Sequence, residues 1–343
     1  MTPTVEHQEP QPLVMRPIFR LLAGLALLWA IAAVNVLWVG SVTIYSPERE
    51  ARRAVLHRAV LDGELPDSIS NWSSLGANSV ALRPVVPWLA EELASWTHLD
   101  LGRCYQLIEF VSVILALAVL FAILKRTLSP TMALIGCLYL AAMLPLSYFM
   151  HYFHPWDKPA LALWLIAVAL LLMDRVFIAS LVISLAVLVK FDAVVVPMLY
   201  VLLFAKRMEG RRFMTRLALL CGAAIVPFAA VMMVRPAADE PRDIAEQFVI
   251  NVRAFGDNWY MYPPFIGLAL PLILGGIGFR RASYEERALY IFAATIAAIL
   301  FLTTNFIEIR AEFVPVALSL PCAAHGLERF LAEQPDRPVP RPA

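Results

Sequence analysis

Residues 159–207 read PALALWLIAVALLLMDRVFIASLVISLAVLVKFDAVVVPMLYVLLFAKR, and their pattern predicts the fold class. The charged residues of this stretch occur in three short groups, Asp174-Arg175, Lys190-Phe191-Asp192 and Lys206-Arg207. Between these groups the chain is almost entirely apolar, with no polar face at helical spacing. A helix that is apolar on every side lies either in lipid or in the core of a large protein. The stretch therefore predicts consecutive helices in a membrane.

The composition of the whole chain supports this prediction. Of its 343 residues, 60% are hydrophobic and 16% are charged, and the net charge is +1. An average soluble domain has roughly 25% charged residues, so this chain cannot cover a soluble surface. The low net charge gives no reason to expect a nucleic-acid partner. The four cysteines show no CxxC spacing and are predicted to be packing residues, not ligands of a metal or redox centre.

Apolar runs predict eight single spans and one pair of shorter helices. Residues 176–189 and 193–205 are too short for two full crossings, and we expect them to form a hairpin with Lys190-Phe191-Asp192 at its tip. The first run continues long enough to be an uncleaved anchor instead of a signal peptide. The predicted single spans are residues 17–40, 105–124, 130–149, 159–173, 217–234, 263–279, 288–305 and 312–328.

Basic residues predict the orientation of these spans. Cytoplasmic loops of membrane proteins carry an excess of Lys and Arg. With the hairpin in place, Lys125-Arg126, the basic loop 206–216 and Arg280-Arg281 all fall on one side. We therefore expect an all-α polytopic integral membrane protein with about ten transmembrane crossings and both termini in the cytoplasm.

The loops on the other side are expected to be periplasmic or extracellular. Residues 15–331 are predicted to form a single membrane domain. The tails 1–14 and 332–343 are predicted to be disordered and cytoplasmic.

The first outer loop, residues 41–104, is predicted to hold two amphipathic juxtamembrane helices. Ser46-Pro47 is a typical helix start, and the helix that follows carries Ala51, Val55, Ala59 and Asp62 on one stripe. A second helix begins at Pro84, and its tryptophans are suited to a membrane interface.

Charged residues at the outer ends of spans are costly at membrane depth and are often functional. Structural roles are the alternative. Glu48 could be only an acid that stabilises a first helical turn, Lys190 could simply pair with Asp192 at a turn, and Arg310 could be a residue that sets the topology. Two histidines three residues apart could bind metal, but no HExxH pattern or ligand cluster follows, so no metal site is predicted. The residues in question are Glu48, Arg83, His151, His154, Asp157, Lys190, Asp192, Glu308, Arg310 and Glu312.

In their order along the chain, these segments resemble the polytopic GT-C glycosyltransferases, particularly the bacterial protein-mannosyltransferase-like and lipid A sugar-transferase-like branch. The resemblance covers roughly residues 17–330. It implies a bacterial inner (plasma) membrane, with the active face periplasmic or extracellular. The chain departs from the family at Glu48-Arg49, where an Asp-Glu pair is common. The matching stretches are Tyr45-Ser-Pro-Glu48 through Gly63-Glu-Leu-Pro66, Arg83-Pro-Val-Val-Pro-Trp88, His154-Pro-Trp-Asp157, Leu185 through Asp192, and Arg310 through Arg329.

The resemblance implies transfer of a hexosyl or pentosyl group from a polyprenyl-phosphate-linked donor to a lipid or glycan acceptor of the cell envelope, with no cofactor. A carboxylate must deprotonate the acceptor hydroxyl, and cations must hold the leaving phosphate. The implied catalytic residues are Glu48, as the base, and Asp157, which positions the acceptor or the lysine. The implied substrate-binding residues are Arg83, His154, Lys190, Asp192, Glu308 and Arg310.

Two other classes of protein fit the same pattern. A transporter or flippase for a lipid-linked glycan would use the same cations without a base, but its usual inverted repeat is not visible here. A non-catalytic membrane assembly protein would tolerate substitution of Glu48 and Lys190.

Overall fold

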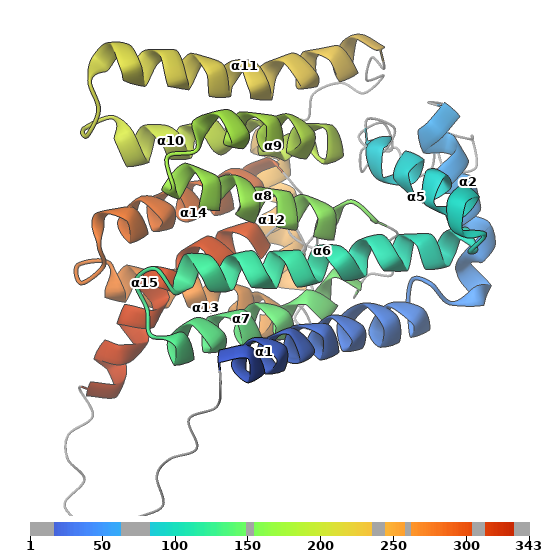
Figure 1. The fold of residues 1–343 in the computed structure, drawn as a ribbon, viewed down its shortest axis with the longest axis horizontal. Coiled ribbons are helices and arrows are strands. Elements are labelled where there is room, and N and C mark those ends of the chain that lie inside the picture. Colours follow the sequence, from blue (N-terminus) through green and yellow to red (C-terminus); the bar gives the residue numbers. More distant parts are fainter. Residues whose placement is uncertain are drawn as a thin grey trace, which may run out of the picture.

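The computed structural model describes residues 17–62, 83–148, 154–234, 244–257, 262–303 and 313–332. Within these ranges the chain forms thirteen α-helices and no strand, which confirms the all-α class. Most of the helices run along the length of one bundle, and α1 begins toward the same end at which α15 finishes (Figure 1). Their bounds are α1 (Pro17–Ala32), α2 (Glu50–Asp62), α5 (Val85–Thr97), α6 (Leu101–Leu124), α7 (Pro130–Met143), α8 (Asp157–Leu172), α9 (Val176–Val189), α10 (Val196–Phe204), α11 (Gly210–Val234), α12 (Ile244–Asp257), α13 (Tyr262–Gly278), α14 (Tyr284–Thr303) and α15 (Phe313–Ala332).

Shorter helical segments extend several of these helices. A π-helical stretch continues α1, and 3-10 turns precede α2, follow α7 and join α9 to α10. These segments are η1 (Ala33–Gly40), η2 (Pro47–Arg49), η4 (Leu144–Tyr148) and η5 (Phe191–Val195).

Local sequence signals place several helix starts. The Asp100 carboxylate accepts a hydrogen bond of 2.9 Å from the backbone amide three residues on and caps α6. Ser129 caps α7 in the same way, with Pro130 at the first helical position. Ser283 and Glu286 form a reciprocal capping box at the start of α14, in which each side chain accepts a hydrogen bond from the backbone amide of the other.

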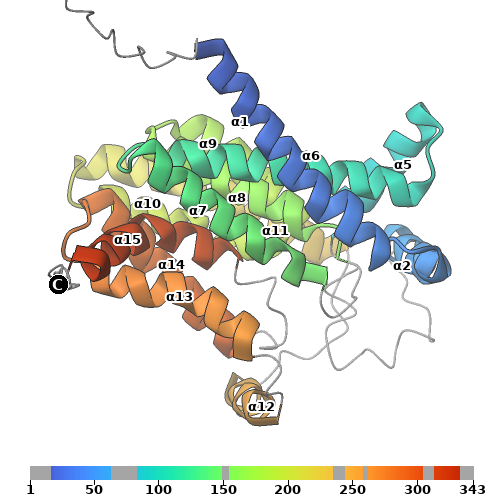
Figure 2. The same cartoon turned by 90° about the horizontal axis from the view of Figure 1, so that it is seen from below.

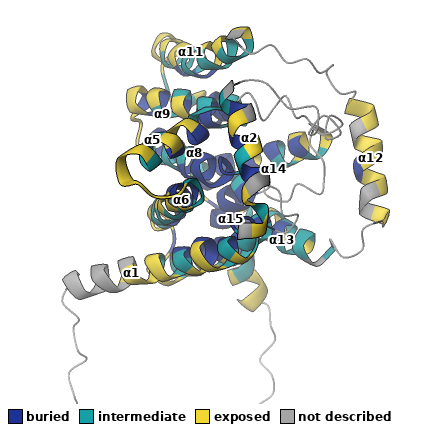
Figure 3. Ribbon diagram, turned by 90° about the vertical axis from the view of Figure 1, so that its right-hand side faces the viewer, coloured by how far each residue is buried: buried dark blue, intermediate teal, exposed yellow. Residues whose placement is uncertain are grey.

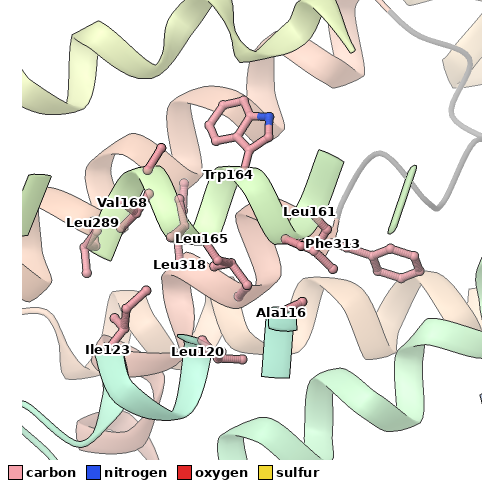
Figure 4. Packing of buried hydrophobic residues seen from close by; sticks show 14 of the residues in the cluster. Ala116, Leu120, Ile123, Leu161, Trp164, Leu165, Val168, Leu289, Phe313 and Leu318 are labelled. Carbon is pink, nitrogen blue, oxygen red and sulfur yellow. The ribbon is translucent and has the colours of Figure 1, made fainter. Parts of the chain in front are cut away.

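The core lies where α6, α8, α14 and α15 meet, and α8 is the central helix. Figure 4 shows Leu120 of α6, Leu165 of α8, Leu289 of α14 and Leu318 of α15 around this seam. All four side chains are buried. Viewed along the bundle, α8 is largely buried while α11 and α12 lie at the edge (Figure 3).

Glycines bring α13 and α15 into close contact. A Cβ atom added to Gly326 would lie 2.0 Å from the carbonyl oxygen of Leu274, and one added to Gly278 would lie 2.1 Å from that of Cys322. Small residues allow helix backbones to approach in this way, and such contacts are typical of helices packed in membranes.

The segment 176–204 forms two short helices that double back, as predicted. Lys190 ends α9 in an extended conformation, and η5 reverses the chain before α10. Both ends of the hairpin lie at one end of the bundle, because Arg216 pairs with Asp174 while Arg207 and Arg126 both pair with Glu285, at 3.9 and 3.3 Å. We call this end of the bundle the tail end. The opposite end, where α9 finishes and α5 begins, is the head end.

Three of the described helical stretches are long and apolar enough to cross a membrane: Leu101–Leu124, Pro130–Tyr148 and Gly210–Met233. Four shorter apolar stretches accompany them, at Ala26–Gly40, Val176–Val189, Phe191–Phe204 and Pro264–Gly278. The structure is therefore compatible with an integral membrane protein, and the number of crossings stays a prediction.

The two predicted juxtamembrane helices are present as α2 and α5. Val55 is the one member of the expected α2 stripe whose side chain is described, and it is exposed; the described side chains of α2 that are buried are those of Arg53, His57 and Val60. Polar contacts set this face, because the Arg53 guanidinium donates hydrogen bonds to the carbonyl oxygens of Ile44 at 2.6 Å and Ser46 at 3.0 Å.

The structure also places a helix, α12, in a part of the chain expected to be an outer loop. It lies across the bundle, so that Figure 2 shows it nearly end-on while the bundle helices run side-on. Asn251 of α12 is buried and donates a hydrogen bond to the carbonyl oxygen of Phe301 in α14.

Candidate functional site

Three of the predicted site residues meet at the head end. Asp157 is the first residue of α8, Lys190 ends α9 and Asp192 lies in η5. The Lys190 Nζ atom is 3.1 Å from Asp157 Oδ1 and 3.2 Å from Asp192 Oδ2. The indole N–H of Trp164 donates to the other Asp192 oxygen at 3.4 Å. Asp157 is buried, whereas the Lys190 and Asp192 side chains are 13% and 31% exposed.

The local sequence explains how these side chains converge. An acid in the first turn of α8 is stabilised by the helix dipole, which suits Asp157. The extended backbone of Lys190 breaks the helix, and Pro197 in the first turn of α10 restarts it after the 3-10 turn. The short reversal therefore brings Lys190 and Asp192 to the start of α8.

A second ion pair lies beside the first and was not predicted. Lys158 Nζ is 3.3 Å from Glu109 Oε2, and both side chains are only 3% exposed. The Tyr148 hydroxyl donates a 2.6 Å hydrogen bond to the same carboxylate, and Lys158 Nζ lies 3.8 Å from the centroid of the Tyr148 ring. Glu109 is the one charged residue in the apolar run 105–124, and a charge inside such a run is a recognised functional signal.

Together these groups form what we call the charged corner: Glu109, Lys158, Asp157, Lys190 and Asp192. Two adjacent residues of α8 contact different neighbours: Asp157 pairs with Lys190 at the end of α9, and Lys158 pairs with Glu109 of α6. The corner holds three carboxylates and two ammonium groups. Buried ions of this kind need partners, and here each ammonium group contacts at least one carboxylate.

Arg83 and His154, both predicted, lie next to the charged corner. The Arg83 guanidinium carbon is 5.2 Å from the centroid of the Trp156 ring and 5.0 Å from that of Phe191. Both distances are typical of cation–π contacts. The His154 ring packs edge-on against Trp156 at 5.2 Å. Because Trp156 precedes Asp157 and Phe191 follows Lys190 in the sequence, Arg83 is held at the edge of the charged corner.

Glu48 is exposed on the 3-10 turn η2. No contact among the described residues joins it to Asp157 or Lys190. Tyr45, three residues earlier, is buried and faces Glu109; burial first, and then that carboxylate, raise the pKa of Tyr45 well above its usual value. Tyr45 therefore stays neutral and anchors the turn that carries Glu48 to the charged corner.

The remaining predicted residues lie outside the part of the chain that the structure describes: Glu308 and Arg310, together with His151 and Glu312. Within the described ranges, no group of three His, Cys, Asp or Glu side chains could hold a metal ion.

No family model, no curated protein and no solved structure matches the chain. The chemistry of the head end is therefore inferred from its own side chains. These are a partly exposed Lys190 held by two carboxylates, an arginine between two aromatic rings, and an exposed Glu48 on an anchored turn.

Proposed function

We propose that the chain is a GT-C-type glycosyltransferase that moves a sugar from a polyprenyl-phosphate-linked donor to a cell-envelope acceptor. The reaction takes place at the head end, which faces the outside of a bacterial inner membrane in this proposal. One observation carries it: two lysines and three carboxylates from distant parts of the sequence gather at the head end of a bundle whose core is apolar. A phosphate that is attached to a membrane lipid would reach protein at this level of the bundle.

Cations at the edge of the charged corner act on the leaving group. As the bond between the sugar and the phosphate oxygen breaks, negative charge grows on the polyprenyl phosphate, and fixed cations stabilise it. Arg83 can bind two phosphate oxygens at once. Lys190 already contacts Asp157 and Asp192, so its charge is largely balanced, and we assign Arg83 the larger share of phosphate binding.

Carboxylates act on the acceptor. Glu48 takes the proton of the acceptor hydroxyl, whose oxygen forms the new bond to the anomeric carbon while polyprenyl phosphate leaves. Asp157 and Asp192 hold Lys190 in position. We assign His154, which packs against Trp156 beside the charged corner, to contact with the sugar. Glu308 and Arg310 keep their predicted roles in substrate binding.

The test compares Glu48→Gln with Glu50→Gln in proteoliposomes that contain labelled undecaprenyl-phosphate hexose or decaprenyl-phosphate pentose and an envelope lipid extract. Glu50 is a matched control, because it is also an exposed acid and begins α2 two residues after Glu48. We expect Glu48→Gln to lower the transfer rate about 10²- to 10⁴-fold, while Glu50→Gln transfers at the wild-type rate.

Equal transfer rates in Glu48→Gln and the wild type would remove Glu48 from the mechanism. Movement of an intact lipid-linked glycan across the vesicle membrane, without sugar transfer, would favour a transporter or flippase instead.

A further inference from the structure

A groove of about 550 Å³ lies between α2 and α5 at the head end, outside the charged corner. Small-molecule sites commonly have volumes of about 300–1,000 Å³, so this groove is large enough for a small organic group. Its polar lining residues are His57, Arg58, Glu91, Glu92 and Ser95.

The floor of the groove is held by a hydrogen-bonded histidine. His57 is buried; its Nδ1 lies 2.7 Å from the Tyr105 hydroxyl, and its Nε2 lies 3.2 Å from Glu91 Oε1. These contacts join α2, α5 and α6, so the floor is fixed before a ligand arrives. The Glu91 side chain is 54% exposed, and its carboxylate therefore faces the groove as well as His57.

The lining mixes acceptors and donors of hydrogen bonds. Glu91 and Glu92 accept, Arg58 donates, and the Ser95 hydroxyl does both. Two carboxylates against one guanidinium disfavour a phosphate group, which carries the same charge as the carboxylates. A neutral group with many hydroxyls suits this lining, because each hydroxyl can both donate to a carboxylate and accept from Arg58.

An exposed aromatic ring lies on the face of α5 that lines the groove. Trp88 is 56% exposed and precedes Glu91, Glu92 and Ser95 by three, four and seven residues, the spacings that share one helix face. A tryptophan beside carboxylates and an arginine offers a flat apolar surface for a sugar ring next to partners for its hydroxyls.

We propose that the groove between α2 and α5 binds a hydroxyl-rich glycan head group, which is the acceptor. This proposal rests on the proposed function. The position of the groove fits, because α5 begins beside Arg83 at the edge of the charged corner, where the donor phosphate is proposed, and α2 begins two residues after Glu48. Donor and acceptor would thus meet across the turn that carries the proposed base.

The experiment uses the full chain in nanodiscs of phosphatidylethanolamine and phosphatidylglycerol, prepared without sugar-based detergent. The probes are the neutral oligosaccharides maltotriose, mannotriose and arabinotriose, and saturation-transfer NMR reports their binding. Ser95→Trp fills the groove, and Thr97→Trp is the matched control, because Thr97 is exposed on the same helix outside the groove.

We expect at least one oligosaccharide to bind to the wild type and to Thr97→Trp, and its signal to be lost in Ser95→Trp. Glu92→Gln keeps the groove open and is expected to weaken binding several-fold, so the test does not depend on a bulky substitution. The absence of binding by every probe, or equal binding by Ser95→Trp and the wild type, would overturn the proposal.

Two outcomes separate this proposal from the proposed function. Oligosaccharide binding that Ser95→Trp abolishes, in a protein that transfers no sugar, supports the groove and contradicts the glycosyltransferase. Sugar transfer at the wild-type rate by Ser95→Trp supports the enzyme and overturns the groove as its acceptor site.

Discussion

The pair formed by Lys158 and Glu109 allows a sharp test at the scale of single residues. Both side chains are 3% exposed, and Tyr148 donates to the same carboxylate. Removal of one member of a buried pair leaves an uncompensated charge and typically costs 3–5 kcal/mol. We therefore expect Lys158→Met to lower the thermal unfolding temperature strongly. The double variant Lys158→Met/Glu109→Gln should recover much of the loss, because the buried charge is gone and Tyr148 can still donate to the amide oxygen.

A thiol-reactive fluorophore can follow this unfolding, because Cys104, Cys137 and Cys322 are buried in the folded chain. The control is Arg126→Gln at the tail end, where the paired side chains of Arg126 and Glu285 are 38% and 35% exposed. Ion pairs with this much exposure contribute about 0–1 kcal/mol, so a small change is expected. Unfolding of Lys158→Met at the wild-type temperature would show that the pair does not stabilise the bundle.

The sequence was informative about the residues that end helices and less so about their partners. Lys190 and Asp192 stand out because they interrupt an apolar run, and in the structure Lys190 contacts both Asp157 and Asp192. Glu109 stands out for the same reason. Its contact with Lys158 could not be predicted, because the two residues are far apart in the sequence and no local pattern links them.

At the scale of helices, the contact between α13 and α15 depends on glycine. A Cβ atom on Gly326 would overlap the Leu274 carbonyl oxygen at 2.0 Å, and backbone cannot move aside as a flexible side chain can. We therefore expect Gly326→Ala to force the two helices apart and to lower the unfolding temperature by several degrees, as strain in a close-packed core does.

Gly222 in α11 provides the matched control, because a Cβ atom there would have no neighbour within 4 Å. Alanine is favoured over glycine inside a helix by about 1 kcal/mol, so Gly222→Ala should leave stability unchanged or raise it slightly. Equal unfolding temperatures for both variants would contradict the close contact of α13 with α15.

The bounds of a helix were predictable where an uninterrupted apolar run forms it. The apolar run 176–189 has the same bounds in the sequence prediction and in α9. The buried face of α2 was not predicted, because Arg53 and His57 are buried through hydrogen bonds to distant groups and not through apolar packing. Helix α12 was missed because its apolar residues are mixed with polar ones within an outer segment.

At the scale of the whole molecule, the two ends of the bundle differ in charge. The turns at the tail end carry many basic residues, including Lys206, Arg207, Arg212 and Arg281. The head end combines acids with its cations, as in the charged corner and the groove. Basic loops are retained in the cytoplasm during membrane insertion, so this asymmetry predicts that the head end faces outward.

Cysteine labelling tests this orientation in a chain whose four native cysteines are replaced by alanine. Arg212→Cys and Arg281→Cys place a thiol at exposed tail-end positions, and Thr97→Cys places one at the head end. In intact cells, an impermeant maleimide should label Thr97→Cys alone, because the membrane shields the basic turns. Permeabilisation of the cells should make all three thiols reactive. This controls for thiols that stay unlabelled because they are buried in the protein. Labelling of both Arg212→Cys and Thr97→Cys in intact cells would contradict the predicted hairpin. The reverse pattern would place the charged corner in the cytoplasm and exclude sugar transfer on the outer face.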